Sequence, residues 1–372
     1  MLVSLQLGSL ISPAYACGCG AMVPSRDNRV AVDRETSVVG WDGRTEQIVM
    51  RLTVRGDAPE AAWIMPVPHR ATVELGDPEV FSELSGLTTP THVTRHYFWP
   101  RDRDWPFGGT TGDSAAAPLP GAPSVEVVGR ERLGPFDVAR LAANDPEALR
   151  SWLAENGFDL PDRLATALKP YVDRKWEYVA VRLTPREGTE PLRGTLDPLR
   201  LRFASDRPVY PMRLSKLAAN PQELELYVLA AHRMEPRGRI GGNAPKVTYA
   251  GRIDTRAASS DTDALAGLTG GGPVFLTAIE QSFPRPELID DDHELRAADA
   301  DTPYRTEIFE DRLLTVAGTP AWVLTLLAVA GVVGAVVLSV ALRMARRGDG
   351  EGPRPPVNPV DRAGGGAATM RA

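Results

Sequence analysis

Residues 35–55 read ETSVVGWDGRTEQIVMRLTVR and carry a β-hairpin signal. From Gln47 to Arg55, apolar and polar residues alternate, which is typical of a strand with one buried face. The preceding Trp41-Asp42-Gly43-Arg44 has the composition of a turn and joins this strand to a second one at Glu35–Gly40. We therefore expect the fold to be built on antiparallel strands.

The rest of the chain adds more strands and a few helices. Two helices begin at Asp77-Pro78 and Asp145-Pro146, because aspartate caps a helix and proline suits its first turn. A third helix is predicted from Pro161 to Lys169, ending before Pro170. Further strands are predicted at residues 61–67, 92–99, 124–132, 176–183, 199–203, 209–214 and 223–231. The mixture predicts an α+β fold with a few helices packed on a mainly antiparallel sheet.

The range Ala321–Leu342 contains no charged residue and predicts a transmembrane helix. At about 1.5 Å per residue such a helix is about 33 Å long, enough to cross a hydrocarbon core of about 30 Å. Trp322 lies at its outer edge, and Arg343, Arg346 and Arg347 follow it directly. Basic residues after an apolar segment stay on the cytoplasmic side. We therefore expect a cell-membrane protein with its large domain outside and a disordered cytoplasmic tail at residues 343–372.

The N-terminus has the features of a secretory signal peptide over residues 1–16. Leu2–Ile11 is apolar, and Ala14-Tyr15-Ala16 fits a cleavage site that places the mature start at Cys17. No Lys or Arg precedes Arg26, so we expect the true start codon to lie upstream of Met1. The alternatives are a buried N-terminal strand and a lipoprotein signal that ends at Cys17.

Composition divides the predicted outer region into parts. We expect folded α+β parts at residues 17–100 and 124–285, separated at residues 101–123 by a flexible loop or linker rich in Gly, Pro, Ala and Asp. Residues 252–272 are predicted to be another surface loop. Acidic residues from 286 onward predict a membrane-proximal stalk over residues 286–320.

The overall charge and the cysteine count exclude some classes of protein. A net charge of −6 disfavours a nucleic-acid surface, which needs a basic excess. The only cysteines are Cys17 and Cys19, so no disulfide-stapled scaffold is possible. No serine-nucleophile motif and no P-loop occur. The sequence therefore predicts no catalytic, cofactor-binding or metal-ligating residues and no cofactor.

Three weaker clusters deserve both a functional and a structural interpretation. Cys17 and Cys19 form a small disulfide, a metal or redox pair, or a lipidation site at Cys17. His92 and His96 share one face of a strand, with Asp102 and Asp104 nearby, so they either bind a transition metal or form a polar strand face. The run Asp290–Glu294 either binds a hard cation or is a solvated acidic stalk, and we favour the stalk because an EF-hand spacing is absent.

Several stretches spread over residues 16–235 share a pattern with one known family. They are Ala16–Gly20, Trp41–Ile48, Trp63–Pro68, Gly134–Val138 with Trp152-Leu153, Tyr171–Ala180 and Pro208–Leu214. Through these stretches the chain resembles the DUF2330 family of uncharacterised bacterial envelope proteins. The resemblance implies a signal peptide, an outer domain and a C-terminal membrane anchor, and it implies no activity and no functional residue.

The sequence thus favours a membrane-anchored extracytoplasmic protein that acts as a non-enzymatic binding or scaffold module of the cell envelope. Its expected partners are the lipid bilayer, through one helix, and an envelope protein or glycan ligand. The alternative is an extracytoplasmic metal-dependent or hydrolytic enzyme whose site is formed by separate loops. Convergence of His92, His96 and a carboxylate, or of the cysteines, in one concave site would favour the enzyme.

Overall fold

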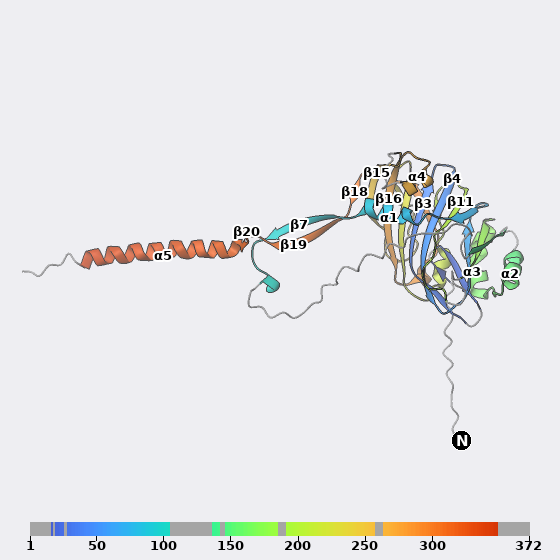
Figure 1. The fold of residues 1–372 in the computed structure, drawn as a ribbon, viewed down its shortest axis with the longest axis horizontal. Helices are drawn as coiled ribbons and strands as arrows, with labels where there is room; N and C mark the ends of the chain where they lie inside the picture. The colour runs from blue at the N-terminus through green and yellow to red at the C-terminus, as the bar shows by residue number, and fades with distance from the viewer. Residues whose placement is uncertain are drawn as a thin grey trace, which may run out of the picture. The chain divides into compact units, whose positions relative to one another are not determined.

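The computed structural model describes residues 16–17, 19–25, 28–104, 136–141, 146–184, 191–256 and 263–348 (Figure 1). The chain divides into two compact units. The larger comprises Met1–His92 and Ala122–Ile308, and the smaller comprises Val93–Gly121 and Phe309–Ala372. The predicted linker at residues 101–123 and the predicted strand at residues 124–132 lie almost entirely outside the described residues.

The larger unit is built on a nine-stranded sheet. In spatial order its strands are β18 (Tyr304–Arg305), β15 (Lys246–Asp254), β16 (Pro273–Phe283), β13 (Gln222–Ala230), β3 (Val30–Trp41), β4 (Thr45–Gly56), β11 (Leu199–Ala204) and β6 (Thr72–Leu75), with β10 (Gly194–Thr195) also paired to β4. Neighbouring strands are antiparallel except β3 and β13, which are parallel. The fold class is α+β, as predicted.

Two smaller sheets complete this unit. The five-stranded sheet has the order β1 (Ala16–Cys17), β2 (Gly20–Pro24), β5 (Ala61–Val67), β9 (Glu177–Leu183) and β8 (Phe136–Leu141). The three-stranded sheet has the order β12 (Val209–Tyr210), β17 (His293–Ala297) and β14 (Met234–Pro236). The predicted strand at residues 209–214 therefore stops after Tyr210, where the chain turns into the 3-10 helix η2 (Arg213–Leu217).

The predicted hairpin is confirmed as β3 and β4, and its turn is stabilised locally. Asp42 Oδ1 accepts hydrogen bonds from the backbone N–H groups of Arg44 and Thr45, at 2.9 and 2.7 Å. Gly43 adopts φ +95°, a conformation that glycine takes without the steric cost of a side chain. Both features are encoded within four residues, which explains why the hairpin is readable from the sequence.

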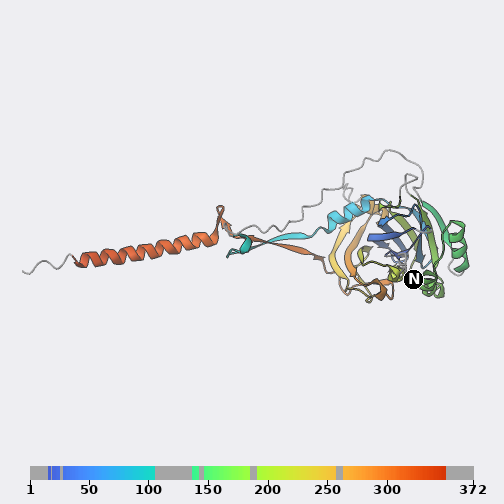
Figure 2. The ribbon, with the colours of Figure 1, turned by 90° about the horizontal axis from the view of Figure 1, so that it is seen from below.

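The helices cover the outer faces of the two main sheets. They are α1 (Glu79–Thr88), α2 (Pro146–Glu155), α3 (Asp162–Asp173) and α4 (Asp263–Thr269). A 3-10 turn, η3 (Pro286–Leu288), also belongs to this unit, whereas η1 (Asp102–Asp104) belongs to the smaller one. One apolar cluster contains residues of α1 and α4 together with Val38, Val49 and Tyr227 of the nine-stranded sheet. A second contains residues of α2 and α3 with Ile64 and Tyr178 of the five-stranded sheet. Figure 2 shows these two helices, in green, at the outer side of the larger unit.

The main core lies between the two large sheets. Its buried side chains come from alternate positions of β3, β4 and β11 on one side and of β5 and β9 on the other, including Ile48, Met50, Trp63 and Val181. Alternation along each strand explains this arrangement, since successive side chains point to opposite faces. The larger unit is therefore a two-sheet sandwich with a pair of helices outside each sheet.

Two predictions about the helices need correction. Helix α3 continues through Pro170 to Asp173, because Tyr171 is fully buried and its packing outweighs the proline penalty. The predicted surface loop at residues 252–272 contains the end of β15 and helix α4, whose Leu265 and Leu268 are buried against the sheet.

The smaller unit carries the predicted apolar helix. Strands β7 (Thr91–Tyr97) and β19 (Glu307–Leu313) form a two-stranded ribbon, and β20 (Thr315–Val316) and β21 (Thr319–Pro320) form a short hairpin. Helix α5 (Ala321–Gly348) follows. Its segment Ala321–Arg346 is long and apolar enough to cross a membrane, and its most apolar stretch of 18 residues contains no residue buried inside the protein.

Candidate functional site

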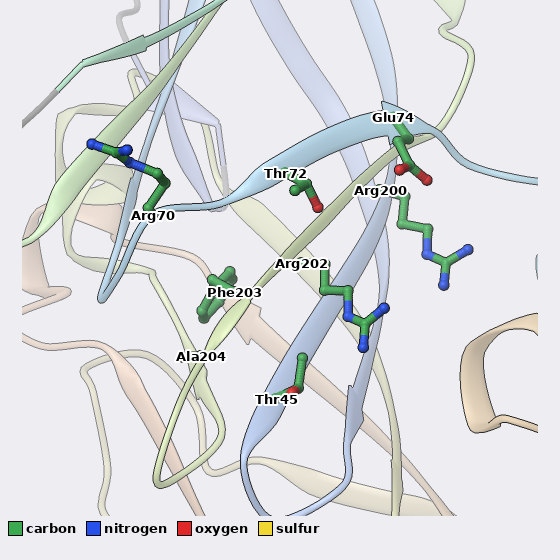
Figure 3. Close-up of a pocket in the computed structure, with 8 residues that line it drawn as sticks. All are labelled: Thr45, Arg70, Thr72, Glu74, Arg200, Arg202, Phe203 and Ala204. Carbon is green, nitrogen blue, oxygen red and sulfur yellow. The ribbon is translucent and has the colours of Figure 1, made fainter.

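A pocket of about 430 Å³ opens at the edge of the nine-stranded sheet formed by β4, β11 and β6. It is lined by Thr45, Arg70, Thr72, Glu74, Arg200, Arg202, Phe203 and Ala204 (Figure 3). We call it the arginine pocket, because three of these residues are arginines and Glu74 is the single acid among them. Its lining is therefore positively charged.

Strand alternation places the arginines. On β11 the apolar residues Leu199, Leu201 and Phe203 are buried in the core, so Arg200 and Arg202 must project from the opposite face. Strand pairing sets Arg202 opposite Thr72 and Arg200 opposite Glu74. Figure 3 shows both arginines extending to the same side of β11.

The two strand arginines differ in how they are held. The Arg200 guanidinium donates to Gln47 Oε1, with Nε at 3.0 Å, and to the carbonyl oxygen of Gly267 at 3.0 Å. Arg202 is exposed, and within the described part of the chain it makes no hydrogen bond and no ion pair. Its charge contributes to a lowered pKa of Asp42, although the hydrogen bond from the Thr45 backbone N–H is the main cause. Arg200 is thus fixed in place and Arg202 is available.

This arrangement suits an oxyanion. Guanidinium groups match carboxylate and phosphate geometry with two parallel N–H donors. Thr45 and Thr72 place hydroxyl groups in the same lining, and each hydroxyl can donate one more hydrogen bond. Arg70 adds a third cation from the turn before β6, with its Nε 3.7 Å from Glu177. The pocket can therefore hold an anionic group through several donors at once.

A second pocket of about 440 Å³ lies beside the first along the chain. It includes His69, Trp176, Ser205 and Arg207, and His69 precedes Arg70 just as Ser205 follows Ala204. Its cations already have acidic partners. Arg207 lies 3.6 Å from Glu294, and Arg174, also in the lining, lies 3.5 Å from Asp292. The arginine pocket is the better candidate because Arg202 has no such partner.

Two of the stretches that resemble the family, Trp41–Ile48 and Pro208–Leu214, contain the residues whose hydrogen bonds hold residues 205–209 in place. Trp41 Nε1 donates to the carbonyl oxygen of Ser205 at 3.1 Å. The Glu46 carboxylate accepts the backbone N–H of Val209, with its oxygens at 3.1 and 3.2 Å. Burial raises the pKa of Glu46 well above its ordinary value. These motif residues therefore have a structural role at the site rather than a direct binding role.

Two residues of the acidic run Asp290–Glu294 do not fit the solvated stalk that we predicted. Asp292 and His293 are only 4% and 1% exposed, because β17 begins at His293 and pairs with both β12 and β14. Asp292 Oδ1 accepts hydrogen bonds from Tyr171 Oη at 2.5 Å and from the N–H groups of Met212 and Arg213 at 2.9 and 3.0 Å. The prediction for these two residues is therefore wrong.

His293 is a neutral histidine inside the fold. Its Nε2 lies 2.7 Å from Gln281 Oε1, and burial lowers its pKa to about 4. Gln281 is itself held by the carbonyl oxygen of Asn243 at 2.7 Å. The position of His293 after three consecutive aspartates gave no sign of this, because its partners come from other strands.

In its described part the structure does not form a metal site from His92, His96 and the aspartates near them, which was the alternative to a polar strand face. His92 and His96 lie on β7 with exposed side chains. Asp104 accepts hydrogen bonds from Tyr97 Oη at 2.7 Å and from the N–H of Arg101 at 2.8 Å. Across the described ranges, no group of three His, Cys, Asp or Glu side chains is placed to hold a metal ion.

Cys19 is anchored in the core of the larger unit. Its backbone N–H donates to Glu35 Oε2 at 3.1 Å, and its sulfur lies 3.4 Å from Met50 Sδ. Glu35 also accepts a hydrogen bond from Tyr210 Oη. Strand pairing sets Cys17 opposite Gly20, while the Cys17 side chain lies outside the described part. A disulfide, a metal or redox pair and lipidation therefore all stay predictions.

Sequence reasoning missed the arginine pocket although a signal was present. The predicted strand at residues 199–203 alternates Leu and Arg, which already places Arg200 and Arg202 on one face. The missing information was the strand order, since β6 and β4 are the neighbours that complete the pocket. Strand order depends on contacts between residues far apart in sequence and is not written in any local pattern.

Comparison with known proteins agrees with the motif resemblance. A family model matches residues 13–296, and that family is DUF2330, described as an uncharacterized protein conserved in bacteria. No curated protein matches the chain. Among solved structures, the crystal structure of baculovirus P35 is similar over 75% of this chain and 97% of its own, at 10% sequence identity. Its TM-score of 0.28 is too low to carry an argument. Because the family match spans well over half of the chain, this protein belongs to the DUF2330 family of uncharacterised proteins conserved in bacteria.

Proposed function

We propose that this protein is a non-enzymatic binding module of the cell envelope that holds a carboxylate or phosphate group in its arginine pocket. The observation that carries the proposal is the contrast between Arg200, which is oriented by Gln47 and Gly267, and Arg202, which faces the same pocket and makes no hydrogen bond or ion pair among the described residues. A fixed cation beside an available one is a prepared site for an anion.

We further propose that α5 anchors this module with the larger unit outside the cytoplasm. The apolar part of α5 is followed by Arg343, Arg346 and Arg347, and positively charged residues beside a membrane span favour the cytoplasmic side. The arginine pocket would then face the envelope, where its ligand is an anionic group on an envelope protein or glycan.

Binding is a better match to this pocket than catalysis. Its described lining offers two threonine hydroxyls and one carboxylate, Glu74, with no histidine or cysteine among them. Nucleophilic catalysis requires a nucleophile and a base within hydrogen-bond reach of each other. Recognition of a charged group requires only oriented donors, which the pocket has.

The test uses the full-length chain in phosphatidylcholine nanodiscs and two probes, inorganic phosphate and citrate. Thermal unfolding of the larger unit is followed by tryptophan fluorescence at rising probe concentration, with chloride at matched ionic strength as the reference. A ligand that binds the folded state raises the midpoint as its concentration exceeds the dissociation constant. We expect at least one probe to raise the midpoint above the chloride reference.

A matched pair of variants assigns the effect to the pocket. Arg202→Ala removes the available cation, and Arg163→Ala removes an exposed arginine of α3, a helix that does not line the pocket. We expect the first variant to lose the probe-induced shift and the second to keep it. An unchanged shift in Arg202→Ala, or no shift in the wild type with either probe, contradicts the proposal.

A further inference from the structure

The end of the β7–β19 ribbon carries an unusual group of exposed apolar side chains. Trp99 is 63% exposed, Val316 is 54% exposed and Phe98 is 36% exposed. Phe98 and Trp99 pack on each other edge to face, with ring centroids 5.2 Å apart. Exposed apolar side chains that gather in one place mark surfaces that contact a partner or a membrane.

Hydrogen bonds tie this group to the first residue of α5. The Leu314 N–H donates to the carbonyl oxygen of Tyr97 at 2.9 Å, and the Ala321 N–H donates to the carbonyl oxygen of Leu314 at 2.9 Å. Phe98 directly follows Tyr97, and Val316 belongs to the hairpin between Leu314 and Ala321. The apolar group is therefore fixed beside the point where the apolar helix begins.

The hairpin that makes this junction is short and well defined. Ala317 and Gly318 both adopt positive φ, at 51° and 80°, as a two-residue type I′ turn requires. The turn brings β20 against β21, so that β19 is connected to α5 without a long linker. The ribbon end and the helix start consequently belong to one hydrogen-bonded junction.

The charges around the group are paired within the ribbon. Arg101 Nη1 lies 2.7 Å from Asp311 Oδ2, and its guanidinium lies over the Tyr97 ring at 4.2 Å. Arg95 stacks on the Phe309 ring, 3.2 Å from its centroid. Paired ions and aromatic rings at an apolar junction have the composition of the region where a membrane protein meets the lipid headgroups.

We infer that Phe98, Trp99 and Val316 form a second membrane contact, which seats in the headgroup region of the leaflet where α5 enters. The inference rests on α5 lying in the bilayer and is independent of the arginine pocket. The occupant is the lipid surface itself, because the group is continuous with a membrane-crossing helix through two hydrogen bonds. Tryptophan is enriched at this depth because its ring is apolar and its N–H is polar.

The test measures quenching of tryptophan fluorescence by brominated lipids. The full-length chain is placed in nanodiscs of phosphatidylcholine that is brominated either near the headgroup or near the end of the acyl chain. Four chains are compared: wild type, Trp99→Phe, Trp322→Phe and, as a control, Trp41→Phe. Trp41 belongs to the larger unit and bonds to Ser205, so its removal should leave the lipid quenching unchanged.

We expect Trp99→Phe to lose part of the quenching caused by bromine near the headgroup, and Trp322→Phe to lose quenching as well. A gain of quenching in Phe98→Trp, which adds a fluorophore at the neighbouring position, would support the same conclusion. If Trp322→Phe loses quenching and Trp99→Phe behaves like Trp41→Phe, the second contact is wrong although the helix is inserted. If neither variant loses quenching, the insertion of α5 and the second contact both fail.

Discussion

Asp292 and Arg202 are charged residues of the larger unit in opposite surroundings. Asp292 is 4% exposed and accepts three hydrogen bonds, whereas Arg202 is exposed and makes no hydrogen bond or ion pair among the described residues. A charge that leaves water must be compensated inside the protein, so Asp292 is part of the fold. A charge left uncompensated beside an oriented neighbour is available to a ligand. The difference separates residues that determine stability from residues that determine binding.

The largest loss of stability is expected from Asp292→Ala. The substitution leaves the Tyr171 hydroxyl and the N–H groups of Met212 and Arg213 without their acceptor, and we expect a loss of about 3 to 5 kcal/mol in the free energy of unfolding. Urea unfolding of the full-length chain in detergent, followed by tryptophan fluorescence, measures it. Asp290→Ala, at an exposed position in the same run, is the control and should change stability little. Equal effects of the two substitutions on the free energy of unfolding would show that the hydrogen bonds of Asp292 do not stabilise the fold.

His293 should make stability depend on pH in a defined window. Its pKa is about 4 in the folded protein, against an ordinary value of 6.5, so the unfolded chain binds more protons between these values. Stability due to this residue is therefore full above pH 6.5 and is lost as pH falls towards 4, by about 3 kcal/mol. His293→Gln keeps a donor to Gln281 and should abolish this part of the dependence. The measurement is the difference between the two unfolding curves across that range, and parallel curves would contradict the prediction.

Arg202→Ala should show the opposite behaviour to Asp292→Ala. Loss of a charge-assisted contact should weaken binding of phosphate or citrate by about ten- to a hundredfold, because such a hydrogen bond contributes about 1.5 to 3 kcal/mol. Without ligand, the free energy of unfolding should stay within about 0.5 kcal/mol of the wild type, since the residue is exposed. Calorimetric titration and urea unfolding give the two values. A large loss in the free energy of unfolding without ligand would show that Arg202 stabilises the fold, as Asp292 does.

The smallest effect is expected where both partners of an ion pair are exposed. Glu235 and Arg296 lie 2.5 Å apart on neighbouring strands, with about a third to a half of each side chain exposed. Such pairs contribute less than about 1 kcal/mol, because water and salt screen them. Glu235→Ala should therefore shift the unfolding midpoint less than His293→Gln shifts it at low pH. A larger shift in Glu235→Ala would show that loss of an ion-pair partner, and not burial of the charged group, determines the loss of stability.

Local sequence signals predicted the parts of the fold that are fixed by neighbouring residues. The Asp42-Gly43 turn bonds to Arg44 and Thr45, and α1 begins after Asp77, whose carboxylate accepts the Glu79 N–H at 2.9 Å. Both features were predicted correctly. Each depends on contacts within a few residues, so composition and spacing were sufficient.

Long-range partners were beyond such signals. Asp292 and Tyr171 are separated by 121 positions, and Arg200 and Gly267 by 67. Nothing within the acidic run distinguishes Asp292 from its exposed neighbour Asp290, and nothing around Arg200 shows that α4 will supply a carbonyl oxygen. The burial of Asp292 and His293 and the formation of the arginine pocket both follow from strand order, which only the three-dimensional structure provides.

The nine-stranded sheet contains one parallel pair of strands, and this pair determines when during synthesis the sheet can form. Strand β3 is bordered by β13, so Thr36 meets Glu225 across 189 positions of chain. Pairing between segments this distant in sequence makes folding slow. Until residues beyond Gln222 have emerged, the N-terminal hairpin presents an open, apolar edge, and open edges recruit other strands. The nascent protein must therefore be protected over much of its length before its sheet can close.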